Sequence, residues 1–269
     1  MTFPHHIIGL LKKSSGWTLC PEYEAVYNAY ITKPSDPDAE VDNTMVLGWV
    51  NDGVWVKKDG IWVFANHAAG ADSLRNWKDP SGTLATAYNS PAHGIWEGYT
   101  GNGSNAYIDL NWNPAVHGVN YQLNSASLGI YIRNNVNESR YDFGVVDASN
   151  WILLASRYSD KYYVGINTAY KTDSDTNTDS RGMFIANRTA SNVNDGYKNK
   201  VQIVNGSDVS NGIPNNNIFV LCHNNNGSPE AIGTKQASIV FTGAGLTQTD
   251  INNITDRFQT RMTYHGTQV

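Results

Sequence analysis

The feature that most constrains the fold is a succession of short segments rich in Tyr, Val and Ile, which runs from about residue 94 to residue 242. Gly and Asn separate these segments, and both residue types tolerate the left-handed backbone angles of tight turns. Short β-branched and aromatic runs between such turns predict antiparallel strands. The predicted strands are 95–99, 106–110, 127–133, 141–146, 151–156, 162–167, 182–187, 196–204, 217–223 and 236–242.

Several of these segments alternate in character. In 127–133, Leu128, Ile130 and Ile132 lie on one face of the predicted strand, and Tyr131 lies on the other. Many such strands at short, regular spacing indicate two stacked sheets. We therefore predict a mainly β fold, a two-sheet antiparallel sandwich of the jelly-roll type.

The N-terminal section has helical character instead. A helix is predicted from Pro21, a residue suited to the first turn, and Lys33–Pro37 ends it. A second helix begins near Asp36, which can cap it with Pro37 in the first turn. The residues that form the apolar stripes of these two helices are Tyr23, Val26, Tyr27 and Tyr30, and then Val41, Met45, Trp49 and Val50. We assign Trp49, Trp55 and Trp62 to the packing of this section on the sandwich.

A third helix is predicted at the C-terminal end. Thr247 can cap it, with Asp250 three residues later in a variant of the capping box. Apolar residues then recur at helical spacing, namely Ile251, Ile254, Phe258 and Met262. The domain prediction is a helical section over 1–66, packed on a jelly-roll domain over 67–269 that includes this last helix.

Charge and cysteine content exclude several classes of protein. The formal net charge is −5, and no cluster of Lys and Arg could neutralise a run of phosphates, so nucleic-acid binding is disfavoured. No apolar stretch approaches the length of a membrane span. The segment 1–11 lacks the basic start and the cleavage site of a secretory signal. Cys20 and Cys222 are expected to be buried free thiols, with a disulfide between them as the alternative.

Several stretches carry a family resemblance. They are 74–80 (LRNWKDP), 97–104 (EGYTGNGS), 107–109 (YID), 120–131, 196–201 (GYKNKV) and 243–247 (GAGLT) with the helix that follows. Through them the chain, from about Glu22 onward, resembles phage and prophage proteins with a laminin-G-like, concanavalin-A-like jelly roll. The resemblance implies a virion-associated protein, made in the bacterial cytoplasm and assembled with other virion proteins. It supplies no catalytic residue.

Covalent chemistry finds little support in the sequence. Glycoside hydrolysis needs two carboxyl groups across one sugar, about 5–5.5 Å apart in retaining enzymes. A Glu-x-Asp-x-Glu run on one strand would provide them, and no predicted strand contains such a run. Glu97, Asp109 and Asp142 are isolated carboxylates. A nucleophile elbow and a phosphate-binding loop are also absent, so we predict no enzyme and no catalytic residue.

A calcium site is one prediction for the acidic segment 173–179. Asp173, Asp175 and Asp179 lie at alternate positions, as the ligands of calcium loops do. The segment departs from the helix-loop-helix pattern, because Thr178 stands where Gly is needed and Phe184 where Glu is needed. A cation in another type of loop and a solvated polar loop both stay open. No other cofactor is predicted.

Carbohydrate binding fits the composition, because aromatic rings stack on the apolar faces of sugars and Asn side chains bond their hydroxyls. The candidate ligand-binding residues are Trp112 with its neighbours Asn111 and Asn113, together with Trp151 and Tyr170. A position in the sandwich core is the alternative for each tryptophan.

Three functions follow from these observations. The first is a virion structural or adhesion protein of the tail, a fibre or the head. It would bind a host-surface glycan or a neighbouring virion protein and form a homo-oligomer, with a trimer as the guess. The second is a polysaccharide depolymerase. The third is an architectural decoration protein with no glycan ligand.

Overall fold

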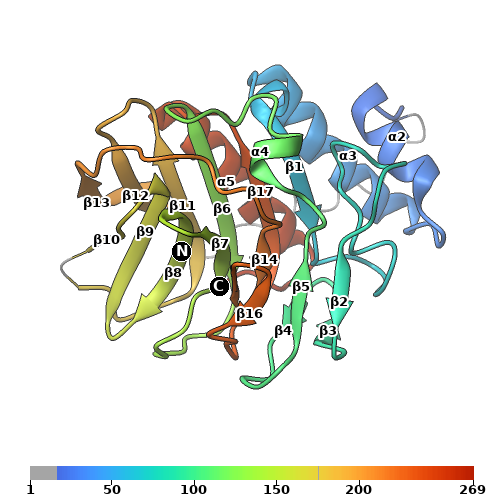
Figure 1. Ribbon diagram of the computed structural model, residues 1–269. Helices are drawn as coiled ribbons and strands as arrows, with labels where there is room; N and C mark the ends of the chain where they lie inside the picture. Colours follow the sequence, from blue (N-terminus) through green and yellow to red (C-terminus); the bar gives the residue numbers. More distant parts are fainter. Residues whose placement is uncertain (1–16, 175) are drawn as a thin grey trace.

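Two β-sheets and a layer of helices make up the structure, a computed structural model that describes residues 17–174 and 176–269 (Figure 1). The helices are α2 (Pro21–Ala29), α3 (Asp36–Asn51), the 3-10 helix η1 (Trp55–Lys57), α4 (Pro114–His117) and α5 (Gln248–Tyr264). None of the helices in these ranges is long and apolar enough to cross a membrane.

The first sheet has the strand order β13-β12-β11-β6-β17-β4-β3, and β1 also pairs with β17. Its strands are β1 (Lys58–Val63), β3 (Ala92–Gly94), β4 (Gly98–Thr100), β6 (Ala126–Ile132), β11 (Gly182–Arg188), β12 (Asn194–Lys198), β13 (Val201–Gly206) and β17 (Gln236–Gly243). All of its pairings are antiparallel among the described strands.

The second sheet has the order β10-β9-β8-β7-β14-β5-β2, with β15 and β16 attached beside β7. Its strands are β2 (Thr86–Tyr88), β5 (Tyr107–Asp109), β7 (Phe143–Asp147), β8 (Asn150–Tyr158), β9 (Lys161–Thr168), β10 (Thr172–Asp173), β14 (Phe219–Val220), β15 (His223–Asn225) and β16 (Ser228–Glu230). Only β15 and β7 pair in parallel in the described part of the chain. The two-sheet antiparallel sandwich predicted from the sequence is therefore confirmed.

Two hydrophobic cores hold the three layers together. Leu128, Ile130 and Ile132 of β6 point between the sheets and pack with residues such as Phe143 of the second sheet. Tyr131 points the other way, into a second core between the first sheet and the helices. The predicted alternation of this strand is thus confirmed, and both of its faces are buried because helices cover the first sheet.

The C-terminal helix forms as its sequence predicts. Thr247 accepts a hydrogen bond from the backbone N–H of Asp250, and the Asp250 carboxylate accepts from the N–H of Thr247, which completes the capping box. The stripe Ile251, Ile254, Phe258 and Met262 lies in the core under the helices. This end of the helix is also tied to η1, since Lys57 Nζ lies 2.6 Å from Asp250 Oδ2.

The capping box leads to a prediction about stability. Replacing Thr247 with alanine removes one helix-capping bond and is expected to lower the free energy of unfolding by about 1 kcal/mol. Urea unfolding followed by circular dichroism measures this change. Thr263→Ala is the matched control, because Thr263 is exposed on the last turn of the same helix. An equal loss in both variants would contradict the role assigned to the cap.

Four details differ from the sequence-based expectations. Ser35, rather than Asp36, is the N-cap of α3. The predicted strand 95–99 begins only at Gly98, because 95–97 form a turn with Trp96 at φ 60°. The predicted strand 196–204 is a hairpin of β12 and β13, whose turn residues have positive φ. Trp62 lies between the sheets, because alternation along β1 turns it away from the helices.

Cys20 and Cys222 are free and buried, as expected.

Candidate ligand-binding groove

A groove with two lobes lies where β1, the segment 76–83 and the segment 110–120 around α4 meet. The first lobe has a volume of about 390 Å³ and the second about 470 Å³. Asp59, His117 and Val119 line both lobes, so the two lobes adjoin at these residues. The first lobe is also lined by Trp62, Asn76, Asp79, Thr83, Leu110, Asn111, Trp112 and Val116, and the second by Glu22, Val50, Trp55, Val56, Lys58, Lys78 and Asn120.

Asp59 holds the groove together. Its carboxylate accepts hydrogen bonds from the backbone N–H groups of Val119, Asn120 and Tyr121 and from the side-chain amide of Asn120, at 2.7–3.1 Å. These donors tie a loop some 60 residues away in sequence to β1. Because four N–H groups already donate to the carboxylate, Asp59 serves as a structural anchor for this loop.

Three asparagine side chains line the groove. In each of them, either the oxygen or the nitrogen of the amide is hydrogen-bonded within the protein, and the other atom is free of hydrogen bonds to the described residues. Asn76 Oδ1 accepts from the N–H groups of Ile61 and Lys78. Asn111 Nδ2 donates to the carbonyl of Leu84 and to Thr86 Oγ1, at 2.8 and 2.9 Å. Asn120 Nδ2 donates to Asp59 Oδ1 at 2.7 Å.

The orientation of each amide is fixed, because a backbone N–H can only donate and a carbonyl or carboxylate can only accept. The free half of each side chain is therefore known. Asn76 offers its NH₂ group, and Asn111 and Asn120 each offer Oδ1; no bond to another described residue occupies these atoms.

His117 adds a donor of fixed direction. Its Nδ1 accepts a hydrogen bond of 2.8 Å from the backbone N–H of Asn113, so the proton of the neutral ring is on Nε2. The histidine is exposed at the end of α4 and borders both lobes. Exposed Val116 and Val119 provide apolar surface beside it, at 66% and 78% exposure.

Trp112 and Asn111 were predicted as ligand-binding residues, and both line the first lobe. Trp112 is only 5% exposed and packs edge-to-face on Tyr121 in the core between the sheets. Its ring therefore presents no face on which a sugar could stack. Trp112 forms part of the groove wall only. Asn111 keeps a free carbonyl oxygen and stands at φ 51°, a left-handed conformation that asparagine tolerates.

The other three predicted ligand-binding residues lie outside this groove. Asn113 caps α4 by accepting from the N–H of Ala115, and its amide donates to Asn215. Trp151 is on β8, opposite Thr168 of β9. Tyr170 follows β9 and is 71% exposed. Residues that the sequence did not predict also line the groove, namely Asn76, Asp79, His117 and Asn120. A single Asn or His has no recognisable pattern in the sequence, and only the fold brings these residues together.

The predicted calcium ligands do not form a cluster in the described part of the chain. Asp173 pairs with Lys161 at 3.0 Å, and Asp179 pairs with Arg181 at 3.0 Å. Asp175 lies outside the described residues. Across residues 17–174 and 176–269, no three His, Cys, Asp or Glu side chains are grouped to hold a metal ion.

Two lysines in the second lobe are held by aromatic rings. Lys78 Nζ donates to the carbonyl of Trp55 at 2.9 Å and lies 4.5 Å from the centre of the Trp55 ring. Lys58 Nζ lies 4.1 Å from the centre of the Phe241 ring and makes a long bond of 3.4 Å to Ser127 Oγ. Burial lowers the pKa of both amines, that of Lys58 to about 7.

This lowered pKa predicts how stability depends on pH. The unfolded amine keeps its ordinary pKa of 10.5, so between pH 7 and 10.5 the unfolded state binds more protons than the folded state. Stability should therefore rise with pH in that window through Lys58. Lys58→Met should remove this rise and raise the free energy of unfolding at about pH 6 by roughly 2–4 kcal/mol. Denaturant unfolding across pH tests it; a variant less stable than the wild type at low pH would contradict it.

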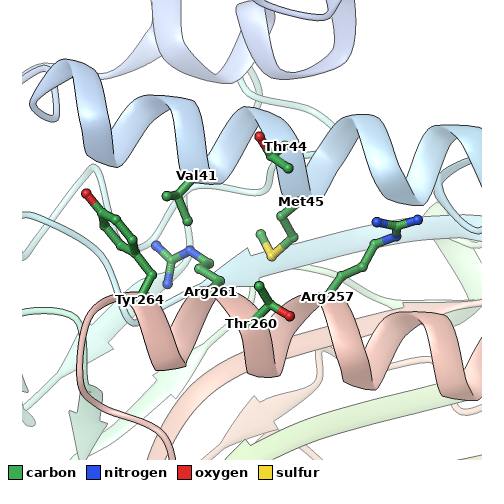
Figure 2. Close-up of a pocket in the computed structure, with 7 residues that line it drawn as sticks. All are labelled: Val41, Thr44, Met45, Arg257, Thr260, Arg261 and Tyr264. Carbon is green, nitrogen blue, oxygen red and sulfur yellow. The ribbon is translucent and has the colours of Figure 1, made fainter. Parts of the chain in front are cut away.

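A smaller pocket lies elsewhere, between α3 and α5 (Figure 2). Its volume is about 120 Å³, and its lining residues are Val41, Thr44 and Met45 of α3 and Arg257, Thr260, Arg261 and Tyr264 of α5. The Arg261 side chain has no exposed surface and pairs with Asp42. Arg257 pairs with Asp52 at 2.6 Å. The terminal nitrogens Nη1 and Nη2 of Arg261 have no hydrogen-bond partner among the described residues. Because the pocket is small and lies between two packed helices, we assign it to helix packing.

Comparison with known proteins shows the fold. No protein-family model and no curated protein matches the chain. Trypanosoma rangeli sialidase in complex with sialic acid is similar in structure, with a TM-score of 0.53 and 10% identity over 80% of this chain and 38% of the sialidase. The binding domain of botulinum neurotoxin serotype D is also similar, with a TM-score of 0.50 and 10% identity over 79% of this chain and 51% of that chain. The fold is a concanavalin-A-like β-sandwich.

The chain spans between about two fifths and half of the length of these proteins. At 10% identity the similarity extends to the architecture of the sandwich alone. It agrees with the concanavalin-A-like part of the sequence resemblance, and a phage origin has no counterpart among these structures.

Proposed function

We propose that this protein is a glycan-binding module and that the two-lobed groove is its ligand site. The observation that carries the proposal is the set of pre-oriented polar groups along the groove. Asn76 and His117 offer N–H donors, and Asn111 and Asn120 offer carbonyl acceptors. Sugar hydroxyls both donate and accept, so an array of both kinds in fixed directions suits them.

Two further features support a sugar as the ligand. The volume of each lobe falls in the range typical of small-molecule sites. Exposed Val116 and Val119 can contact the apolar C–H faces of a sugar ring where no aromatic face is available. Trypanosoma rangeli sialidase, of which this chain matches 38%, is a structurally similar protein that has been seen in complex with sialic acid.

We further propose that the module serves a phage particle in adhesion to the host. The resemblance of segments such as 97–104 and 196–201 to phage and prophage proteins supports this role. A homo-oligomer, with a trimer as the working guess, would add avidity to weak single sites. Mass spectrometry of purified particles tests the virion location, and absence of the chain from them would refute it.

A polysaccharide depolymerase is the second candidate, because Asp59 and Asp79 both line the first lobe. Glycoside hydrolysis requires one of two carboxyl groups to act as an acid. Both oxygens of the Asp59 carboxylate already accept hydrogen bonds from N–H groups of the 119–121 loop, so neither is free to attack a sugar or to activate a water. We therefore propose binding without cleavage; new reducing ends formed on host capsule, and lost in Asp79→Asn, would favour the enzyme.

Groove variants test the proposed site. Val119→Trp places a large side chain where the two lobes adjoin. On a glycan array, this variant is expected to lose binding to the glycans that the wild type binds. His117→Ala removes one donor and should weaken binding about fivefold. Val209→Trp is the matched control, because Val209 is 67% exposed and lies outside the groove. Unchanged binding by both groove variants would place the site elsewhere, and no retained glycan would refute the function.

A further inference from the structure

We propose that the groove selects uncharged oligosaccharides, that it rejects sugars carrying carboxylate or sulfate groups, and that Asp79 is the main determinant of this choice. This inference rests on the proposed function and names the class of ligand for the same site. It is argued from the charged groups that line the groove and from what each already contacts.

The two lysines that line the groove are already engaged in contacts within the protein. Lys78 donates to the carbonyl of Trp55 and lies against the Trp55 ring. Lys58 is 2% exposed, with its ammonium group over Phe241. Lys58 would have to leave its buried position to form an ion pair with a ligand. Lys78 is half-buried, and its charge already interacts with the carboxylates of Asp59 and Glu22.

Asp79 is the most accessible of the carboxylates and amines that line the groove. Asp79 is exposed at the edge of the first lobe, and Glu22 is partly exposed in the second. Asp59 adds a third negative charge between them. An anionic sugar in either lobe would therefore meet like charge, which costs binding energy because the lysines of the groove are already engaged by groups of the protein.

A neutral sugar gains from the same arrangement. The Asp79 carboxylate can accept hydrogen bonds from ring hydroxyls, and such charge-assisted bonds are stronger than neutral ones. The free amide and imidazole groups supply the remaining donors and acceptors without adding charge. The two lobes meet at Asp59 and Val119, so a chain of several sugars can lie across both.

Matched neutral and anionic probes test the inference by calorimetry at low and at physiological salt. The neutral probes are maltotriose, N-acetylchitotriose and N-acetyllactosamine. The anionic probes are trigalacturonate and 3′-sialyl-N-acetyllactosamine. The wild type is expected to bind at least one neutral probe and to bind the anionic probes at least about tenfold more weakly. Asp79→Asn keeps an acceptor oxygen and removes the charge. It should reduce the ratio of the affinities for neutral and anionic probes about fivefold at low salt, and by less at high salt.

The control variant is Asp36→Asn, which removes the same charge from an exposed position outside the groove lining. It should leave the selectivity unchanged. Anionic probes that bind as tightly as neutral ones, or a gap that Asp79→Asn leaves unaltered, would overturn this inference while the glycan-binding function stands. If none of the probes binds and Val119→Trp has no effect on array binding, both fail together.

Discussion

Arg261→Ala is expected to lower the free energy of unfolding by about 3–5 kcal/mol. Arg261 Nε donates to Asp42 Oδ1 at 2.5 Å, and neither side chain has any exposed surface. Removing the arginine leaves the Asp42 carboxylate buried, with the hydroxyl of Tyr23, 3.3 Å from Oδ2, as its hydrogen-bond donor among the described residues. The pair joins α3 to α5, so its loss should loosen the packing of these two helices on each other.

The expected loss of stability comes from the Asp42 carboxylate, which stays buried without a counter-ion in Arg261→Ala. A double variant can show this. Asp42→Leu combined with Arg261→Met replaces the ion pair with apolar side chains and should recover most of the stability lost in Arg261→Ala. Guanidinium unfolding of the single and double variants measures the coupling between the two residues. A loss below about 1 kcal/mol in Arg261→Ala would mean that the pair contributes little to holding the helices.

Arg188→Ala is expected to cost about 4 kcal/mol for a different reason. The fully buried Arg188 guanidinium donates to the backbone carbonyls of Ile166, Ala190, Ser191 and Asp208, at 2.7–3.3 Å. It thus fastens the end of β11 to β9 and to two loops. Its removal leaves these carbonyls without their donor and opens a cavity.

Thermal unfolding measures this effect, with an expected fall in Tm of roughly 10 °C for a chain of this size. Arg188→Lys should restore only part of the loss, because one ammonium group cannot reach the carbonyls that the planar fork spans. Arg181→Ala is the control, since Arg181 is an exposed arginine in a surface ion pair with Asp179. Equal Tm values for the Arg188 and Arg181 alanine variants would contradict the assigned role.

Local patterns in the sequence predicted the elements well. The stripe of α5 and its cap at Thr247 are decided by residues within a few positions of one another, so they can be read without the fold. The alternation around Tyr131 is equally local. The order of strands depends on contacts between distant segments, such as the pairing of β1 with β17, and no local pattern contains it.

The candidate site was predicted only in part for the same reason. Trp112 and Asn111 drew attention as an aromatic residue beside an amide, and both line the groove. Composition could not tell that Trp112 points into the core. In the sequence, Asp59, Asn76 and Asn120 are ordinary polar residues far from one another. They lie together only in the fold, where the Asp59 carboxylate binds the N–H groups of the 119–121 loop.

The division of the chain at residue 66, the phage origin and the trimer stay predictions. The helices of the first section and the sandwich share one core. Sequence alone also suggested ligand contacts at Trp151 and Tyr170, which lie on or beside β8 and β9, outside the groove lining. Substitution of Tyr170 is therefore expected to leave groove binding unaffected.

The central claim is that the half-used amides of the groove contact the sugar, and side-chain amide NMR tests it most directly. Titrating the protein with a bound neutral oligosaccharide should shift the Nδ2 resonances of Asn76, Asn111 and Asn120, while that of Asn211, which donates to Ser149 and Asn150 outside the groove, stays in place. Shifts confined to amides outside the groove would contradict the account.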